Sequence, residues 1–244
     1  MPNQKATIIT IILVALGGVS LSACRTPAPA PTSLDATRTS SDSYLAYQRG
    51  DCLTVQKLTD PAGLRVWAHD EMRHSTLLLR GFCHEIEGDI QGARDIYRQL
   101  AREAPGSFAS NDAAERTRIL KIIEKDPDYL QWVDGARERA HSDKPRRTPV
   151  DRIPVEFPPL AKAIGIDGYA IVEFEITRRG NTENPVVVES HPPLLFDGAV
   201  LRAVRRWQYE REPSTSEPDR QLIRILFRPD GWQGASDQGA MGVP

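Results

Sequence analysis

The stretch FDGAVLRAVRRWQY, residues 196–209, decides how the second half of this chain folds. Apolar side chains recur along it at steps of three and four, the spacing of one face of an α-helix. They are Ala199, Val200, Ala203, Val204 and Trp207. The pattern predicts that the arginines on the other face point toward water: Arg202, Arg205 and Arg206. Asp197 stands where a helix N-cap is expected.

Three strands surround this helix in the sequence. GYAIVEFEIT begins at residue 168 and alternates side chains between two faces, as a β-strand does. RRGN at 178–181 is a turn, and PVVVES at 185–190 is a second strand that begins at a proline. QLIRILFR at 221–228 alternates again. The pattern predicts an α+β domain, in which a three-stranded antiparallel sheet carries a helix across one face.

The ordered motifs of this segment resemble the TonB C-terminal domain, over residues 149–229. That family forms the periplasmic end of the energy transducers for outer-membrane transport. The matching positions are Phe157-Pro158, Ala161, Gly168, Gly180, Glu189-Ser190, Phe196-Asp197, Arg205-Arg206-Trp207, Tyr209-Glu210 and Ile225-Leu226-Phe227. Phenylalanine at 157 replaces the family's tyrosine and lacks its hydroxyl. An unrelated α+β domain with the same periodicity is the alternative.

The resemblance implies a protein partner in the cell envelope, such as a segment of a TonB-dependent receptor, bound by β-strand addition to the last strand. Carried over by position, the partner-binding residues are Glu156, Phe157, Pro158, Gln221, Ile223, Arg224, Ile225 and Arg228. Plain core packing is the alternative for Phe157 and Ile225. Domains of this family can also exchange strands, so a homodimer stays open.

The N-terminus predicts a secretory leader over residues 1–23, an apolar run after Lys5. Its end, Leu-Ser-Ala-Cys, resembles a bacterial lipobox, which implies lipid (palmitate) attachment at Cys24. An uncleaved membrane anchor is the alternative. Arg25 favours sorting to the outer membrane over retention at the inner membrane, by resemblance to enterobacterial lipoproteins. Residues 24–43 would be a flexible tether, facing the periplasm.

The apolar run contains no histidine and no charged residue. Family transducers keep a polar residue in their membrane helix to couple to a proton-driven motor, so this run lacks the means of such coupling.

Residues 44–123 switch to helical periodicity and predict an all-α module. Residues 81–105 resemble one tetratricopeptide repeat through Gly81, Gly88, Ala93, Tyr97 and Pro105. A second Gly-Asp step lies upstream, which suggests two degenerate repeats and a closing helix. An irregular helical bundle is the alternative.

Cys52 and Cys83 form an even pair once Cys24 carries lipid, and an oxidising compartment favours a disulfide between them over two buried thiols. The five histidines show no metal-ligand spacing, and no nucleophile elbow, P-loop or dinucleotide fingerprint is present. We therefore expect no enzyme activity, no metal and no cofactor.

Residues 124–148 predict a charged linker that could hold a short amphipathic helix over 129–140, with Leu130, Trp132 and Val133 on its apolar side. The Gly-rich residues 230–244 predict a disordered tail. A net charge of −2 offers no basic excess for nucleic acid. Two function classes remain: a transport-associated adaptor that captures envelope proteins, and a periplasmic scaffold of envelope complexes or peptidoglycan without a transport role.

Overall fold

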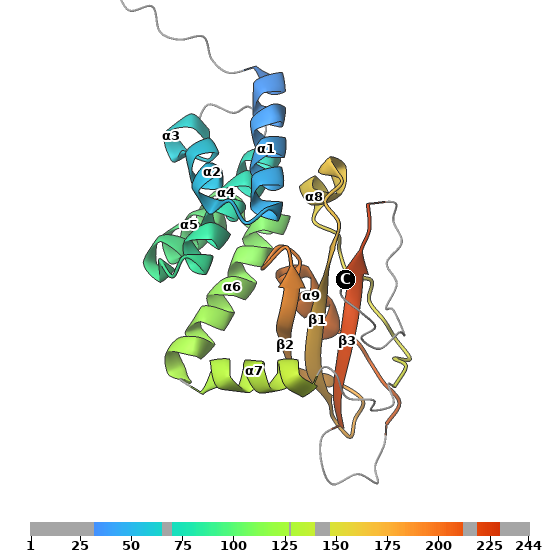
Figure 1. The fold of residues 1–244 in the computed structure, drawn as a ribbon. Helices are drawn as coiled ribbons and strands as arrows, with labels where there is room; N and C mark the ends of the chain where they lie inside the picture. The colour runs from blue at the N-terminus through green and yellow to red at the C-terminus, as the bar shows by residue number, and fades with distance from the viewer. Residues whose placement is uncertain (1–31, 65–69, 127, 140–146, 212–218, 230–244) are drawn as a thin grey trace, which may run out of the picture. The chain divides into compact units, whose positions relative to one another are not determined.

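The computed structural model describes residues 32–64, 70–126, 128–139, 147–211 and 219–229 (Figure 1). The predicted leader, the lipid site at Cys24 and the tail at 230–244 lie outside the described residues. Among the helices in the described ranges, none is both long and apolar enough to cross a membrane. All the described residues belong to one compact unit.

The first part of this unit is a helical module. Its helices are α1 (Ser33–Gln48), α2 (Cys52–Leu58), α3 (Pro61–Leu64), α4 (Asp70–Ile86), α5 (Ile90–Glu103) and α6 (Phe108–Lys125). Side-chain caps fix where several of them begin, because an oxygen accepts an otherwise unpaired backbone N–H. Asp51, Asp89 and Ser107 cap α2, α5 and α6 in this way.

Helix α1 begins earlier than the sequence predicts, since residues 33–43 were expected to belong to the tether. Thr32 and Asp35 form a reciprocal capping box that starts the helix at Ser33. The side chain of Ser40 is buried and lies 2.7 Å, oxygen to oxygen, from that of Thr76 on α4. This contact holds the first turns of α1 against the module.

One disulfide bond and close packing between helices stabilise the module. A disulfide joins Cys52 on α2 to Cys83 on α4, with 5.3 Å between their Cα atoms. Gly81 lets α4 and α5 approach, because a Cβ at this position would lie 2.7 Å from the ring of Tyr97. The descent of this module from tetratricopeptide repeats stays a prediction.

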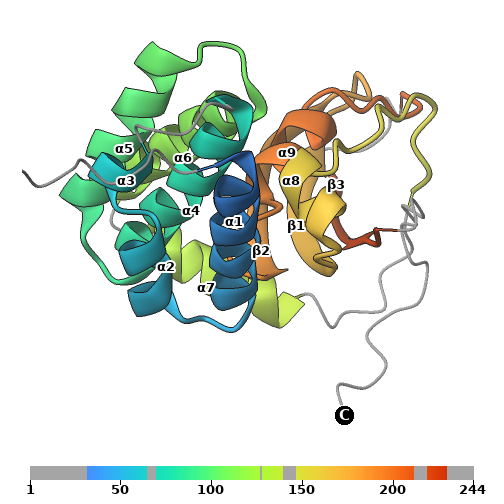
Figure 2. The same cartoon turned by 90° about the horizontal axis from the view of Figure 1, so that it is seen from above.

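The second part is the predicted α+β domain, and its fold class is confirmed. Strands β1 (Gly168–Ile176), β2 (Thr182–His191) and β3 (Asp219–Phe227) form one antiparallel sheet in the order β2-β1-β3. Helices α8 (Pro159–Ile164) and α9 (Asp197–Val204) complete the domain. Helix α9 contacts α6 of the helical module as well as β1 and β2 of the sheet, and Figure 2 shows it next to both.

Helix α9 is shorter than the period of 196–209 suggests. Gln208 forms an isolated bridge with Asp151, and the backbone N–H of Tyr209 donates to the carbonyl of Gly180. The chain turns at Arg205 and Arg206, and these partners hold the residues that follow Trp207. Trp207 is nevertheless in the core, where its indole N–H donates to the carbonyl of Ile153 at 2.9 Å.

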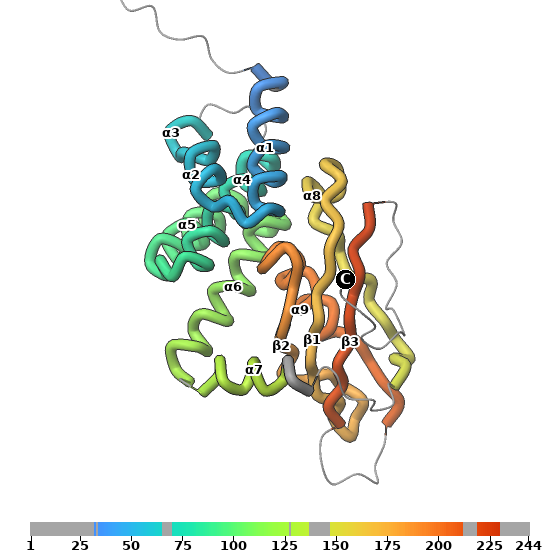
Figure 3. The backbone as a smooth tube through the Cα atoms, in the orientation of Figure 1, coloured from blue at the N-terminus to red at the C-terminus, as the bar shows by residue number. Residues whose placement is uncertain are grey.

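Helix α7 (Tyr129–Arg139) forms where the linker was predicted, and it packs on the sheet. Figure 3 follows the chain from α6 into α7, which brings α7 alongside β2. Trp132 and Val133 pack against Val186 and Val188, as their apolar pattern suggests. Leu130 does not share this face and is 54% exposed. The segment therefore covers part of one sheet face instead of standing free between two domains.

Candidate partner-binding edge and its support

Strand β3 lies at an edge of the sheet, as the sequence predicts. It pairs with β1 from Asp219 to Phe227, and no other strand of the described residues pairs with it. An edge strand presents backbone N–H and C=O groups that can accept an added strand. The outer side of β3 is therefore the candidate binding edge.

The side chains of β3 divide between two faces. Those that point inward are buried in the core or next to it: Gln221, Ile223, Ile225 and Phe227. Gln221 donates to Asp219 and accepts the backbone N–H of Arg147. Of the predicted binding residues on this strand, Gln221, Ile223 and Ile225 can therefore offer a partner their backbone but not their side chains.

The segment before α8 also turns mostly inward. The ring of Phe157 meets those of Phe196 and Phe227 edge-on at 5.8 and 5.4 Å between centroids, so Phe157 packs in the core. Pro158 is buried at the start of α8. Glu156 is exposed, and its carboxylate lies 3.8 Å from Arg202. Arg228, directly after β3, is exposed as well.

The outward side chains of β3 are Leu222, Arg224 and Leu226, each half-buried. The guanidinium of Arg224 lies 4.0 Å from the ring centroid of Tyr169 on β1, a cation–π distance. The Tyr169 hydroxyl donates to Glu189 on β2. That hydrogen bond, more than partial burial, raises the pKa of the Tyr169 hydroxyl.

Two predictions about α9 are wrong: the identity of its N-cap residue and the exposure of two of its arginines. Helix α6 of the helical module packs against α9. Asp197 does not cap the helix by a side-chain hydrogen bond; Phe196 is the N-cap residue. The carboxylate of Asp197 is buried instead and lies 3.5 Å from the guanidinium of Arg116 on α6. Arg116 also binds Glu85 on α4, which in turn accepts the hydroxyl of Tyr97.

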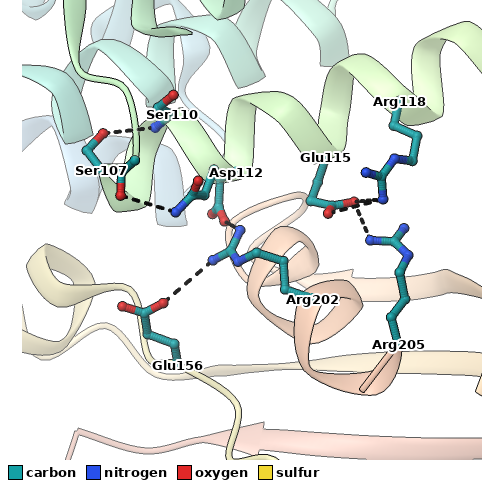
Figure 4. A network of polar contacts seen from close by, with 10 residues as sticks. Ser107, Ser110, Asp112, Glu115, Arg118, Glu156, Arg202 and Arg205 are labelled. Atoms are coloured by element: carbon teal, nitrogen blue, oxygen red, sulfur yellow. Dashed lines mark hydrogen bonds and ion pairs between the residues drawn. The ribbon is translucent and has the colours of Figure 1, made fainter. Parts of the chain in front are cut away.

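The arginines of α9 face the same neighbour. Figure 4 shows Arg202 reaching Asp112 on α6 and Arg205 reaching Glu115 on α6. Arg202 and Arg205 were predicted to point toward water, whereas Arg206 is exposed as expected. Sequence reasoning missed the acidic partners because they stand on another helix, 90 positions away.

Gly198 allows this interface to form. A Cβ added to Gly198 would lie 2.4 Å from the carboxylate oxygen of Asp112 and 3.1 Å from its Cα atom. The backbones of α6 and α9 therefore approach each other at a point where only glycine fits. A glycine in the first turn of an otherwise regular helical pattern was the available signal for a close contact.

Burial at this interface raises the pKa of Asp112 to about 7, although Arg202 opposes the shift. Because the folded state then holds a proton more tightly than the unfolded state, the contribution of Asp112 to stability is full below pH 4 and falls as the pH rises toward 7. Asp112→Asn should remove this dependence. As the pH rises from 4 to 7, the wild type should therefore lose up to about 1.4 kcal/mol of unfolding free energy per pH unit relative to the variant.

Urea unfolding of both proteins at several pH values measures this difference. A difference that stays constant from pH 4 to pH 8 would mean that Asp112 remains ionised throughout.

Within the described ranges, no group of three or more histidine, cysteine, aspartate or glutamate side chains is placed to hold a metal ion. The candidate site consists of the unpaired backbone edge of β3, the ring of Tyr169 and the guanidinium of Arg224.

Comparisons with known proteins support the same assignment for the C-terminal domain. Residues 153–229 match the family model for the Gram-negative bacterial TonB protein C-terminal domain, so the resemblance is confirmed there. Protein TonB of Salmonella typhimurium is 32% identical over 77 residues, which is 31% of this chain and 30% of that protein. Protein TonB of Escherichia coli K12 is 32% identical over 76 residues, again 31% and 30% of the two chains.

Protein TonB of Pseudomonas aeruginosa is 37% identical over 80 residues, which is 32% of this chain and 23% of that protein. The chain thus spans less than a third of the length of these curated relatives, and the helical module lies outside the match.

Proposed function

We propose that this protein is a non-enzymatic envelope adaptor in TonB-associated transport, and that β3 captures an extended segment of an outer-membrane receptor or transporter by strand addition. The observation that carries the proposal is the place of β3 at the sheet edge in a domain that matches the TonB C-terminal family. Main-chain hydrogen bonds would supply affinity, and outward side chains would supply selectivity.

The same proposal places the chain on a membrane surface facing the periplasm. Acyl chains on Cys24 would anchor it, at the outer membrane given Arg25, since two or more chains bind a bilayer firmly. Labelled palmitate should then enter the wild-type protein, and Cys24→Ser should abolish that labelling and release the protein from membranes. Equal labelling of both proteins would contradict lipid attachment at Cys24.

A scaffold of envelope complexes is the second candidate. It is favoured by the charged contact between α6 and α9, which fixes the helical module against the C-terminal domain. Two rigidly joined modules can hold two partners at a set distance. In this case the helical module, and not β3, would make the principal contacts.

Photo-crosslinking in cells separates the two candidates. A photoreactive residue in place of Arg228, which is exposed directly after β3, should capture the periplasmic segments of β-barrel receptors. The matched control carries the same group in place of Leu53, which is 62% exposed on α2. Receptor segments captured at 228 alone support strand addition. Capture of only peptidoglycan or envelope lipoproteins, or the same products from both positions, would overturn it in favour of the scaffold.

A further inference from the structure

The outer part of β3 carries a positive charge between two apolar side chains. Leu222, Arg224 and Leu226 alternate with the buried residues of the strand, so all three lie on the sheet face opposite α9. Leu222 packs toward the small cluster beneath α7. The outward side chains along the unpaired edge of β3 are therefore apolar, cationic and apolar in turn.

The charge of Arg224 is not neutralised within the described part of the chain. Its guanidinium stacks on the ring of Tyr169. None of the described residues accepts a hydrogen bond from this guanidinium, and none of their carboxylates forms an ion pair with it. Its Nε atom is buried and has no acceptor. A carboxylate of a ligand would therefore meet a guanidinium that no carboxylate of the described residues already neutralises, and charge-assisted hydrogen bonds are the strong ones.

The other arginine of this strand differs from Arg224 in having a carboxylate partner. Arg220, on the same strand, pairs with Glu175 at 3.0 Å. The carboxylate of Glu189 accepts the hydroxyl of Tyr169. Tyr169 thus holds the guanidinium of Arg224 against its ring.

We propose that β3 selects extended segments in which an aspartate or glutamate is flanked, two residues away on each side, by apolar residues. The inference rests on the proposed strand addition. A strand added at about 4.8 Å from β3 places alternate side chains on the same face. The acidic side chain then meets Arg224 while its neighbours meet Leu222 and Leu226. A carboxylate matches the planar guanidinium and can accept two hydrogen bonds from it.

Short synthetic peptides of this pattern test the inference on the full chain. One peptide carries the central aspartate and a second carries asparagine in its place, which keeps the size and the strand propensity. Fluorescence anisotropy of labelled peptides measures both affinities. The aspartate peptide should bind about tenfold more tightly than the asparagine peptide, and the gap should narrow as salt is added.

Variants of two arginines on β3 show which residue causes the difference between the two peptide affinities. Arg224→Gln keeps the strand and should bring the two peptide affinities together. Arg220→Gln is the matched control, since Arg220 already has a partner in Glu175, and it should leave the ratio unchanged. Amide signals of β3, followed by NMR, report strand addition independently of the acidic residue.

Three outcomes decide between the ideas. A tenfold ratio that Arg224→Gln removes supports both strand addition and acidic selection. Equal affinities in the wild type, with shifted β3 amide signals, overturn the selection and leave strand addition standing. No binding and unshifted β3 amide signals overturn strand addition together with the selection that depends on it.

Discussion

Replacing Arg116 by methionine should lower the free energy of unfolding by about 3–5 kcal/mol, because two buried carboxylates lose their counter-charge. Arg116 on α6 binds Glu85 on α4 and lies near Asp197 on α9, and each of the three side chains is at most 9% exposed. Burial by itself would lower the pKa of the Arg116 guanidinium, but the charges of Glu85 and Asp197 raise it, so the arginine stays ionised.

The variant also tests whether the helical module and the C-terminal domain unfold together. Arg116 joins helices of the module to the first turn of α9, so its loss weakens the contact between the two parts. We expect unfolding in urea to change from one transition to two. Circular dichroism follows the helices, and the fluorescence of the buried Trp207 follows the domain when the other three tryptophans of the chain are replaced by phenylalanine in both proteins.

Arg118→Met is the matched control for this experiment. Arg118 lies on the same helix, is 55% exposed, and contacts Glu115 at 3.4 Å. Exposed ion pairs contribute about 0–1 kcal/mol, so this variant should unfold almost as the wild type does. If both substitutions lowered the free energy of unfolding equally, the burial of Arg116 would add nothing to its contribution to stability.

Replacing Phe157 by alanine should cost about 3–5 kcal/mol of stability, the usual range for loss of a large aromatic side chain from a core. The three rings of Phe157, Phe196 and Phe227 touch one another, and the last two stack with centroids 4.1 Å apart. Removal of Phe157 opens a cavity between α8, α9 and β3. Thermal unfolding should show a lower midpoint.

This result separates a packing role from a partner-binding role for Phe157. Glu156→Ala is the neighbouring control, since the Glu156 side chain is 62% exposed and should change stability little. Phe157→Leu keeps most of the volume and should recover much of the loss. A Phe157→Ala variant that kept its stability but failed to capture receptor segments would mean that the side chain acts at the partner.

Much of the fold follows from local patterns in the chain. The alternation in residues 168–177 and 221–228 predicted two strands, and the helical period starting at Phe196 predicted α9. The apolar period around Trp132 predicted α7 within the linker. Such patterns suffice because each element must bury its own apolar face, whatever it packs against.

The candidate edge was also predictable in part. The ordered motifs located β3 and the segment before α8, but they did not say which side chains face inward. Gln221 and Ile223 were expected to meet a partner and are buried instead. The positions inferred from the family resemblance describe where a partner strand would run. The burial of each side chain decides which atoms that partner strand can contact.

The sequence by itself determined the three strands, their order along the chain and the family that the C-terminal domain resembles. Only the tertiary structure decided that Asp197, Arg202 and Arg205 face the helical module and not water. A charged residue on a helix is exposed by default, because burying a charge is costly unless a partner neutralises it. Here the partners of the two arginines stand 90 positions away on α6, and no local pattern reports a pairing over that distance.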